Sequence, residues 1–348
     1  MGPRPALQMV GAVRMEDTDI LNDLRAGRAP STAPESDSGT ASLLDTSSSD
    51  LAGSDLPGSE TSALGAHVSL ANAARGRVSR LEYLQMRIIR RTLEPGFVDR
   101  ALRWFQRTFG VWWITLVTFR LHRIHHMDRL LPLAPLESFI LVSNHRSFFD
   151  LYVLIAAMLR WGLRQRIVFP VRSNFFYDTV AGFFVNGVMS FFAMYPPLFR
   201  DKRRATLNIV GIEELGALLR QGETLVGIHP EGRRNTSDDP YELLPAKSGV
   251  GRLIHAAGSV AVVPVFTNGL LPNNLPRQII SNFDGTGTPI HSVFGHAIDF
   301  GDLLSEPPSL KLFTKIAEIC MDEVRKLGEQ ERVLRALEGQ AAPKGLTQ

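Results

Sequence analysis

A histidine and an aspartate stand five residues apart, directly after a short apolar segment. Residues 139–142 have the length of a buried strand, His145 follows them, and Asp150 opens the apolar run 151–159, which is long enough for a helix. Because a spacing of five does not align two side chains on one helical face, a bend must bring the Asp150 carboxylate onto the imidazole. There it would fix the tautomer and stabilise the imidazolium, so His145 could act as a general base. The alternative is a histidine whose hydrogen bond is purely structural.

Two more polar clusters follow apolar runs further along the chain. Residues 229–235, His-Pro-Glu-Gly-Arg-Arg-Asn, come after the run 224–228, and residues 195–200, Tyr-Pro-Pro-Leu-Phe-Arg, lie between this cluster and His145. Open α/β sheets bind ligands at the carboxyl ends of their strands. Three clusters at successive element ends therefore predict one converging site.

These clusters carry a resemblance to a known family. The order N-H-x-x-x-x-D at 144–150, Arg200 after an apolar run, P-E-G-x-R at 230–234 and V-P-V at 263–265 resembles the glycerolipid acyltransferases, best known as 1-acylglycerol-3-phosphate acyltransferases. The match covers roughly residues 131–271. The chain departs from the family in two places: Arg233 stands where Thr is usual, so the family's Arg corresponds to Arg234, and Phe199 replaces the acidic residue before Arg200.

The resemblance implies transfer of an acyl group from acyl-CoA or acyl-carrier protein to a lysophospholipid hydroxyl, with no cofactor and no metal. The implied acceptor is 1-acyl-sn-glycerol-3-phosphate, which would give phosphatidic acid. Glycerol-3-phosphate or another lipid is an alternative acceptor, and a non-catalytic membrane-binding module is the alternative from a different class.

The same resemblance assigns roles to residues of this chain. His145 and Asp150 would be catalytic, with Asn144 and backbone N–H groups after His145 as candidate donors to the oxyanion. Guanidinium groups would bind the acceptor phosphate with forked hydrogen bonds, and Gly232 would let the backbone approach the ligand. Glu231 would accept from an acceptor hydroxyl or hold an arginine. The expected substrate-binding residues are Arg200, Glu231, Gly232, Arg233, Arg234 and Lys247.

Other chemistries fit the sequence less well. A serine hydrolase could use Ser147 with His145 and Asp150, but the chain has no G-x-S-x-G motif, and it also lacks a G-x-x-x-x-G-K-[ST] nucleotide loop. His122 and His126 have helical i, i+4 spacing without an H-E-x-x-H pattern. We expect them to be solvated or to face lipid headgroups.

Apolar runs and helical patterns alternate along the chain. The expected strands are 139–142, 166–171, 224–228, 260–266 and, less clearly marked, 292–294; the expected helices are 148–159, 205–220, 249–257 and 310–327. This alternation predicts an α/β fold with a mixed or largely parallel sheet flanked by helices. The single cysteine, Cys320, fits a core position in a protein from a reducing compartment.

Composition divides the 348 residues into four parts. Residues 1–70 predict a disordered, acidic tail rich in Ser, Gly and Ala, without the apolar region of a signal peptide. Residues 71–130 predict Arg-rich amphipathic helices that associate with a membrane. Residues 131–335 predict the acyltransferase domain, and residues 336–348 a flexible tail.

The Arg-rich part also holds three tryptophans, Trp104, Trp112 and Trp113. Its uncharged run, 108–119, is about half of the ~20 residues that span a bilayer. We therefore expect a monotopic protein on an anionic, cytoplasmic membrane face, with no nucleic-acid partner. The alternative is a helix pair packed on the domain's own core. The Phe-rich segment 175–192 is open between core, acyl pocket and membrane-embedded surface, with a pocket or interfacial wall favoured.

Overall fold

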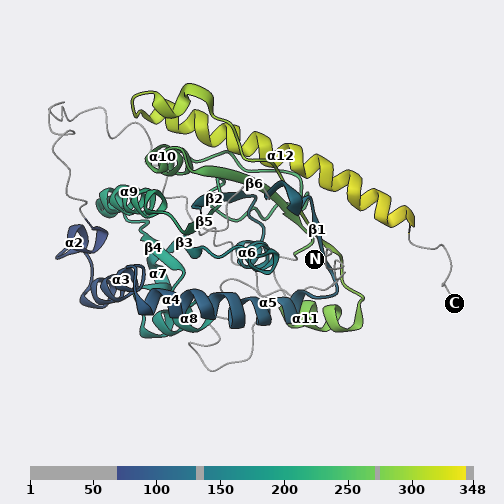
Figure 1. Ribbon diagram of the computed structural model, residues 1–348, viewed down its shortest axis with the longest axis horizontal. Coiled ribbons are helices and arrows are strands. Elements are labelled where there is room, and N and C mark those ends of the chain that lie inside the picture. Colours follow the sequence, from purple (N-terminus) through teal and green to yellow (C-terminus); the bar gives the residue numbers. More distant parts are fainter. Residues whose placement is uncertain (1–68, 131–136, 271–274, 342–348) are drawn as a thin grey trace, which may run out of the picture.

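The structure is a computed structural model that describes residues 69–130, 137–270 and 275–341 (Figure 1). The tail expected at 1–70 lies outside the described residues except for its last two. Of these, Leu70 is buried, and its backbone N–H donates to Glu214 at 2.9 Å. Position 70 is therefore already part of the folded molecule.

In the described part of the chain, seven strands form one sheet in the order β1-β7-β6-β2-β5-β3-β4. The strands are β1 (His122–His125), β2 (Phe139–Ser143), β3 (Arg166–Arg172), β4 (Met194–Leu198), β5 (Thr224–Ile228), β6 (Ala261–Asn268) and β7 (Ile290–Phe294). All neighbouring strands are parallel except β6 and β7. This arrangement confirms the predicted α/β class with a mixed, mostly parallel sheet.

Helices cover both faces of the sheet. α9 (Ala205–Gln221), α10 (Ser248–Ala257) and α12 (Leu310–Ala341) pack on one side, while α6 (Asp150–Trp161) and the helices around it pack on the other (Figure 1). The remaining helices are α2 (Leu70–Ala74), α3 (Arg80–Thr92), α4 (Phe97–Phe105), α5 (Val111–Thr118), α7 (Ser173–Phe176), α8 (Val180–Ser190) and α11 (Leu275–Asp284). Single turns are η2 (Gln106–Gly110, a π-helix), η3 (Met127–Leu130), η4 (Lys202–Arg204) and η5 (Gly301–Ser305). Burial on both faces explains why β2 and β5 are apolar along most of their length rather than alternating.

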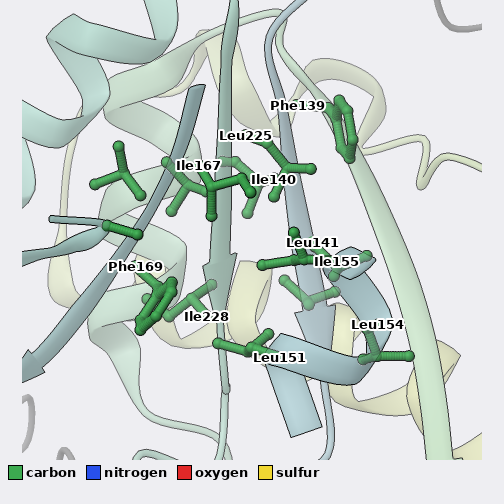
Figure 2. Close-up of a cluster of buried hydrophobic side chains, with 14 of the residues drawn as sticks. Phe139, Ile140, Leu141, Leu151, Leu154, Ile155, Ile167, Phe169, Leu225 and Ile228 are labelled. Carbon is green, nitrogen blue, oxygen red and sulfur yellow. The ribbon is translucent and has the colours of Figure 1, made fainter. Parts of the chain in front are cut away.

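The packing of α6 against the central strands sets the position of the loop between β2 and α6, which carries His145. Figure 2 shows Leu151, Leu154 and Ile155 of α6 against side chains from β2, β3 and β5. Gly227 of β5 makes the close approach possible, because a Cβ at that position would lie 2.9 Å from Cδ2 of Leu151. The first turn of α6, which carries Asp150, is thereby held at the end of β2.

The N-terminal helices pack on this core through buried ion pairs. Glu214 of α9 accepts from the Leu70 N–H, from Nε of Arg90 and, at 2.7 Å, from the Tyr195 hydroxyl. Arg103 and Asp99 pair within α4 at 2.8 Å, and Oδ1 of Asp99 lies 3.6 Å from Nε of Arg166 in β3, which links α4 to the sheet. These two arginines of the expected membrane segment therefore serve internal contacts.

Two expected boundaries differ from the structure. Residues 122–125, expected within a helical segment, form the edge strand β1, because pairing with β7 outweighs the local helical spacing of His122 and His126. The last helix, expected to end near 327 with a flexible tail from 336, continues to Ala341. Its extension is held by Glu331, which accepts from the Tyr241 hydroxyl at 2.7 Å, and by Glu338, 3.5 Å from His291.

Candidate active site

The loop after β2 contains the bend that the spacing of His145 and Asp150 predicts. Oδ2 of Asp150 accepts the backbone N–H groups of Arg146 at 2.7 Å and Ser147 at 2.8 Å. The same oxygen lies 3.2 Å from Nδ1 of His145. Both side chains are buried. Two backbone hydrogen bonds thus aim the carboxylate at one nitrogen of the imidazole.

Burial controls the charge of this pair. Desolvation, and then the charge of Arg234, lower the pKa of His145 to about 3. Desolvation raises the pKa of Asp150 to about 6, although His229 and the N–H donors of Ser147 and Arg146 oppose that shift. At neutral pH the imidazole is therefore neutral and the carboxylate ionised. Since Nδ1 faces a carboxylate, the proton belongs on Nδ1, and Nε2 is the nitrogen that can accept one.

Glu231 clamps the backbone of the catalytic loop. Its Oε1 accepts the His145 N–H at 2.8 Å and its Oε2 accepts the Leu244 N–H at 3.1 Å. The N–H of Asn235 donates to the His145 carbonyl at 2.8 Å. Burial raises the pKa of Glu231 to about 7. Glu231 was expected to contact an acceptor hydroxyl or an arginine; in the structure each of its oxygens accepts a backbone N–H.

Asn144 also has a structural role in place of the expected one. Its Oδ1 accepts the Thr267 N–H and its Nδ2 donates to the Thr267 carbonyl, both at 2.8 Å, so the amide bridges β2 and β6. An amide engaged at both ends is not placed to serve an oxyanion. Behind it, the Thr267 hydroxyl lies 3.1 Å from that of Ser292, which lies 2.8 Å from Nε2 of His122. His122 is therefore a buried network member rather than a solvated histidine.

The basic residues are spread along the same edge of the sheet. Arg234 follows β5, is half-buried, and lies near enough to lower the pKa of His145. Arg233 is exposed, and Gly232 between them and Glu231 has φ 68°, a left-handed conformation that favours glycine. Lys247 precedes α10, and its N–H donates to the Pro230 carbonyl at 2.8 Å. Of these residues, Arg234 is the one whose charge acts on the buried imidazole.

Arg200 lies further away. It follows β4, which is three strands from β2 in the sheet, or about 14 Å at the usual strand spacing. Because β2, β5, β3 and β4 are parallel, Arg200 is at the same carboxyl edge as His145 and Arg234. The structure thus places the three predicted clusters at one edge, with Arg200 on its far side.

Two further residues, His229 and Arg146, belong to the site although no role was predicted for them from the sequence. The ring of His229 lies flat on that of His145, with centroids 3.8 Å apart and planes 7° apart. Arg146 donates to the carbonyls of Ser237 at 2.6 Å and Asp239 at 3.2 Å, and so ties the two loops together. The available signal for His229 was its position as the first residue after the apolar run 224–228.

Comparisons with known proteins bear on this edge of the sheet. Residues 122–268 match the family model described as Acyltransferase, a segment that starts at β1 and ends at β6. The similarity to the acyltransferase family is therefore confined to this segment. The crystal structure of the 1-acyl-sn-glycerophosphate (LPA) acyltransferase PlsC from Thermotoga maritima is similar, with 16% identity and a TM-score of 0.42 over 75% of this chain and 93% of that one. No curated protein matches the chain.

Among the described residues there are two clusters of potential metal ligands. One is His145, Asp150 and His229, where flat stacking puts the two imidazoles in parallel planes, so their lone pairs do not converge. The other is His125, His291 and Glu338. There Nδ1 of His291 faces His125 at 3.2 Å and Nε2 faces Glu338 at 3.5 Å, so the partners use opposite nitrogens. Both arrangements are explained by hydrogen bonding and stacking.

An apolar cavity of about 40 Å³ lies beside α6. It is lined mainly by side chains of α5, α6, β3 and the end of α8, among them Trp113, Ile114, Tyr152, Ile155, Phe169 and Phe191. Trp113 contacts Phe149, next to Asp150, with ring centroids 6.2 Å apart. The end of the Phe-rich segment 175–192 thus forms a cavity wall, while the other face of α8 exposes Phe184 and Val188.

Proposed function

We propose that this acyltransferase moves a fatty acyl group from acyl-CoA or acyl-carrier protein to a hydroxyl of a glycerolipid. The favoured acceptor is 1-acyl-sn-glycerol-3-phosphate, and the product would then be phosphatidic acid. The observation that carries the proposal is the buried contact of 3.2 Å between His145 Nδ1 and Asp150 Oδ2, with Arg234 close by. This arrangement places a neutral base, His145, close to a cation, Arg234.

The reaction follows from this geometry. The acceptor hydroxyl gives its proton to Nε2 of His145 while its oxygen attacks the thioester carbonyl. Asp150 holds Nδ1–H and stabilises the resulting imidazolium. The tetrahedral intermediate then expels the thiolate, which takes the proton back from His145. An ester and a free thiol result, and no acyl-enzyme is needed.

The charge around the imidazole favours an anionic acceptor. Arg234 and Arg233 stand beside the catalytic loop, and Arg200 and Lys247 flank the same edge. Guanidinium groups bind phosphate with forked hydrogen bonds, which fixes the direction of an adjacent hydroxyl. We assign Arg234 and Arg233 to the acceptor phosphate and place Arg200 at the periphery.

An apolar face suits an acceptor that lies in a membrane. Figure 1 shows α4, α5, α8 and α11 along one edge of the molecule, and α5 contacts α11 as η2 contacts α8. Exposed apolar side chains on this edge are Phe97, Val98, Trp104, Phe105, Phe109, Trp112, Leu116, Val180, Phe184, Val188, Ile280 and Phe283. Among the described residues, no helix is long and apolar enough to cross a bilayer. A surface of this kind supports monotopic binding to a membrane.

The decisive test is acyl transfer by purified protein to lysophosphatidic acid, lysophosphatidylcholine and glycerol-3-phosphate, with mass-spectrometric identification of products. We expect transfer to lysophosphatidic acid, and a fall in kcat of at least about a hundredfold in His145→Ala. His296→Ala is the matched control, because His296 is exposed and outside the site. Transfer to glycerol-3-phosphate alone would change the acceptor. Vesicle binding without transfer to any acceptor would favour the membrane-binding module.

A further inference from the structure

Two imidazoles lie face to face at the centre of the site. The ring centroids of His145 and His229 are 3.8 Å apart, with planes 7° apart. Both residues come from the ends of neighbouring strands, since β2 pairs with β5 in a register that aligns Val142 with Ile228. The strand register therefore delivers His229 to the flank of His145.

His229 is held independently of His145. Its Nδ1 lies 3.1 Å from the Ser143 carbonyl and 3.2 Å from the Ser143 hydroxyl. A carbonyl can only accept, so Nδ1 of His229 carries the proton and donates to Ser143. The ring is thus anchored at its edge to β2, and its face is presented to His145.

The charges around His229 keep it neutral at neutral pH. Burial and the neighbouring His145 lower the pKa of His229 to about 3, while Asp150 and the backbone of Ser143 and Asn144 act in the opposite direction. A neutral aromatic ring beside an imidazole can do two things. It limits rotation of the facing ring, and its π-face stabilises a cation formed there.

We infer that His229 is a positioning residue for the base His145, acting through its ring face. This rests on the proposed function, in which His145 becomes an imidazolium during acyl transfer. The flat contact holds His145 in the orientation that keeps Nδ1 on Asp150 and Nε2 toward the acceptor hydroxyl. When the proton arrives on Nε2, the face of His229 stabilises the charge. His229 itself neither gives nor takes a proton.

Three substitutions separate the ring face from the hydrogen bond. His229→Phe keeps a flat ring and loses the donor to Ser143. His229→Asn keeps a donor near the Nδ1 position and loses the ring. His229→Ala loses both. We expect His229→Phe to retain kcat within about threefold, and the Asn and Ala variants to lose about tenfold in kcat with little change in acceptor KM, the size expected from one ring-face contact to a desolvated cation.

A double-mutant cycle with His145→Ala tests whether the effect passes through the base. We expect His229→Asn to reduce kcat in the wild-type background and to have no further effect in the His145→Ala background. Thermal melts of each variant, with His296→Ala as control, show whether the fold is kept.

The outcomes are distinguishable. Wild-type kcat in His229→Asn, loss of kcat in a folded His229→Phe, or additive losses in the cycle would each overturn the inference. If His229→Phe does not fold, the Asn variant and the cycle still decide. If His145→Ala keeps full activity, the proposed function itself is wrong, whereas an inactive His145→Ala beside a fully active His229→Asn removes only the role of His229.

Discussion

Two buried carboxylates with raised pKa values contact His145 and make different hydrogen bonds. Asp150 aims at the imidazole of His145, while Glu231 accepts backbone N–H groups from His145 and Leu244. For both carboxyl groups the largest cause of the shift is burial. Because the pKa of each is raised in the folded state, each contributes stability at low pH that is lost as the pH rises through its folded pKa. The folded protein thus accommodates an ionised Asp150 at neutral pH, which the proposed reaction requires.

The pKa of Asp150 predicts the pH below which acyl transfer slows. Asp150 stabilises the imidazolium only in its ionised form, and the pKa of Asp150 is about 6. We expect kcat/KM for acyl transfer to fall below about pH 6 with unit slope. Asp150→Asn should lack this limb and lose at least about a hundredfold in kcat while remaining folded. The check is a pH–rate profile with circular dichroism at each pH. An unchanged acidic limb in Asp150→Asn would assign it to another group.

At the scale of elements, a glycine in strand β5 allows α6 to pack closely on the sheet. Gly227 of β5 lets Leu151 pack closely, and Asp150 is the residue before Leu151. The packing of α6 on the central strands therefore also fixes the position of the Asp150 carboxylate. The effect differs from that of a loop substitution, because the helix moves as a unit.

Gly227→Ala tests this constraint. The added Cβ would lie 2.9 Å from Leu151 Cδ2, so α6 must shift or the side chain must repack. We expect a loss of about 1–3 kcal/mol in the free energy of unfolding, together with a fall in kcat that exceeds any change in KM. Urea denaturation and steady-state kinetics measure the two effects. Gly339→Ala on α12 is the control, since a Cβ there meets nothing within 4 Å. Wild-type kcat in Gly227→Ala would show that the site tolerates the shift.

At the scale of the whole molecule, many of the exposed apolar side chains lie on helices at one edge of the described structure. The edge formed by α4, α5, α8 and α11 exposes aromatic and aliphatic side chains, whereas α12 lies at the opposite side (Figure 1). The alternative of a helix pair packed on its own core describes only the inner faces, where Met86 and Ile89 are buried. The outer faces stay exposed, and they are the surface to which the proposed membrane binding is assigned.

Vesicle sedimentation tests that surface. Trp112 is 63% exposed and Phe184 is 63% exposed, on α5 and α8. We expect the Trp112→Ser/Phe184→Ser variant to lose most binding to vesicles that contain anionic phospholipid, while transfer to a short-chain soluble acceptor is retained. Val333→Ser/Leu337→Ser is matched in exposure but lies on α12, and should bind like wild type. Equal binding by all three proteins, or no binding by any at low salt, would contradict the membrane assignment.

The sequence by itself determined the α/β class, five of the strands and the pairing of His145 with Asp150. These depend on local apolar runs and on a short bend, which one stretch of chain specifies. The tertiary structure decided the rest. Glu231 and Asn144, which the sequence placed at the substrate, hold backbone groups in the structure, because their partners His145 and Thr267 lie 86 and 123 residues away along the chain. Residues 122–125 became a strand because β7 was available to pair with them. His229 lies against His145 because of the register in which β2 and β5 pair. The register between two distant strands depends on how their side chains pack and cannot be deduced from local sequence spacing.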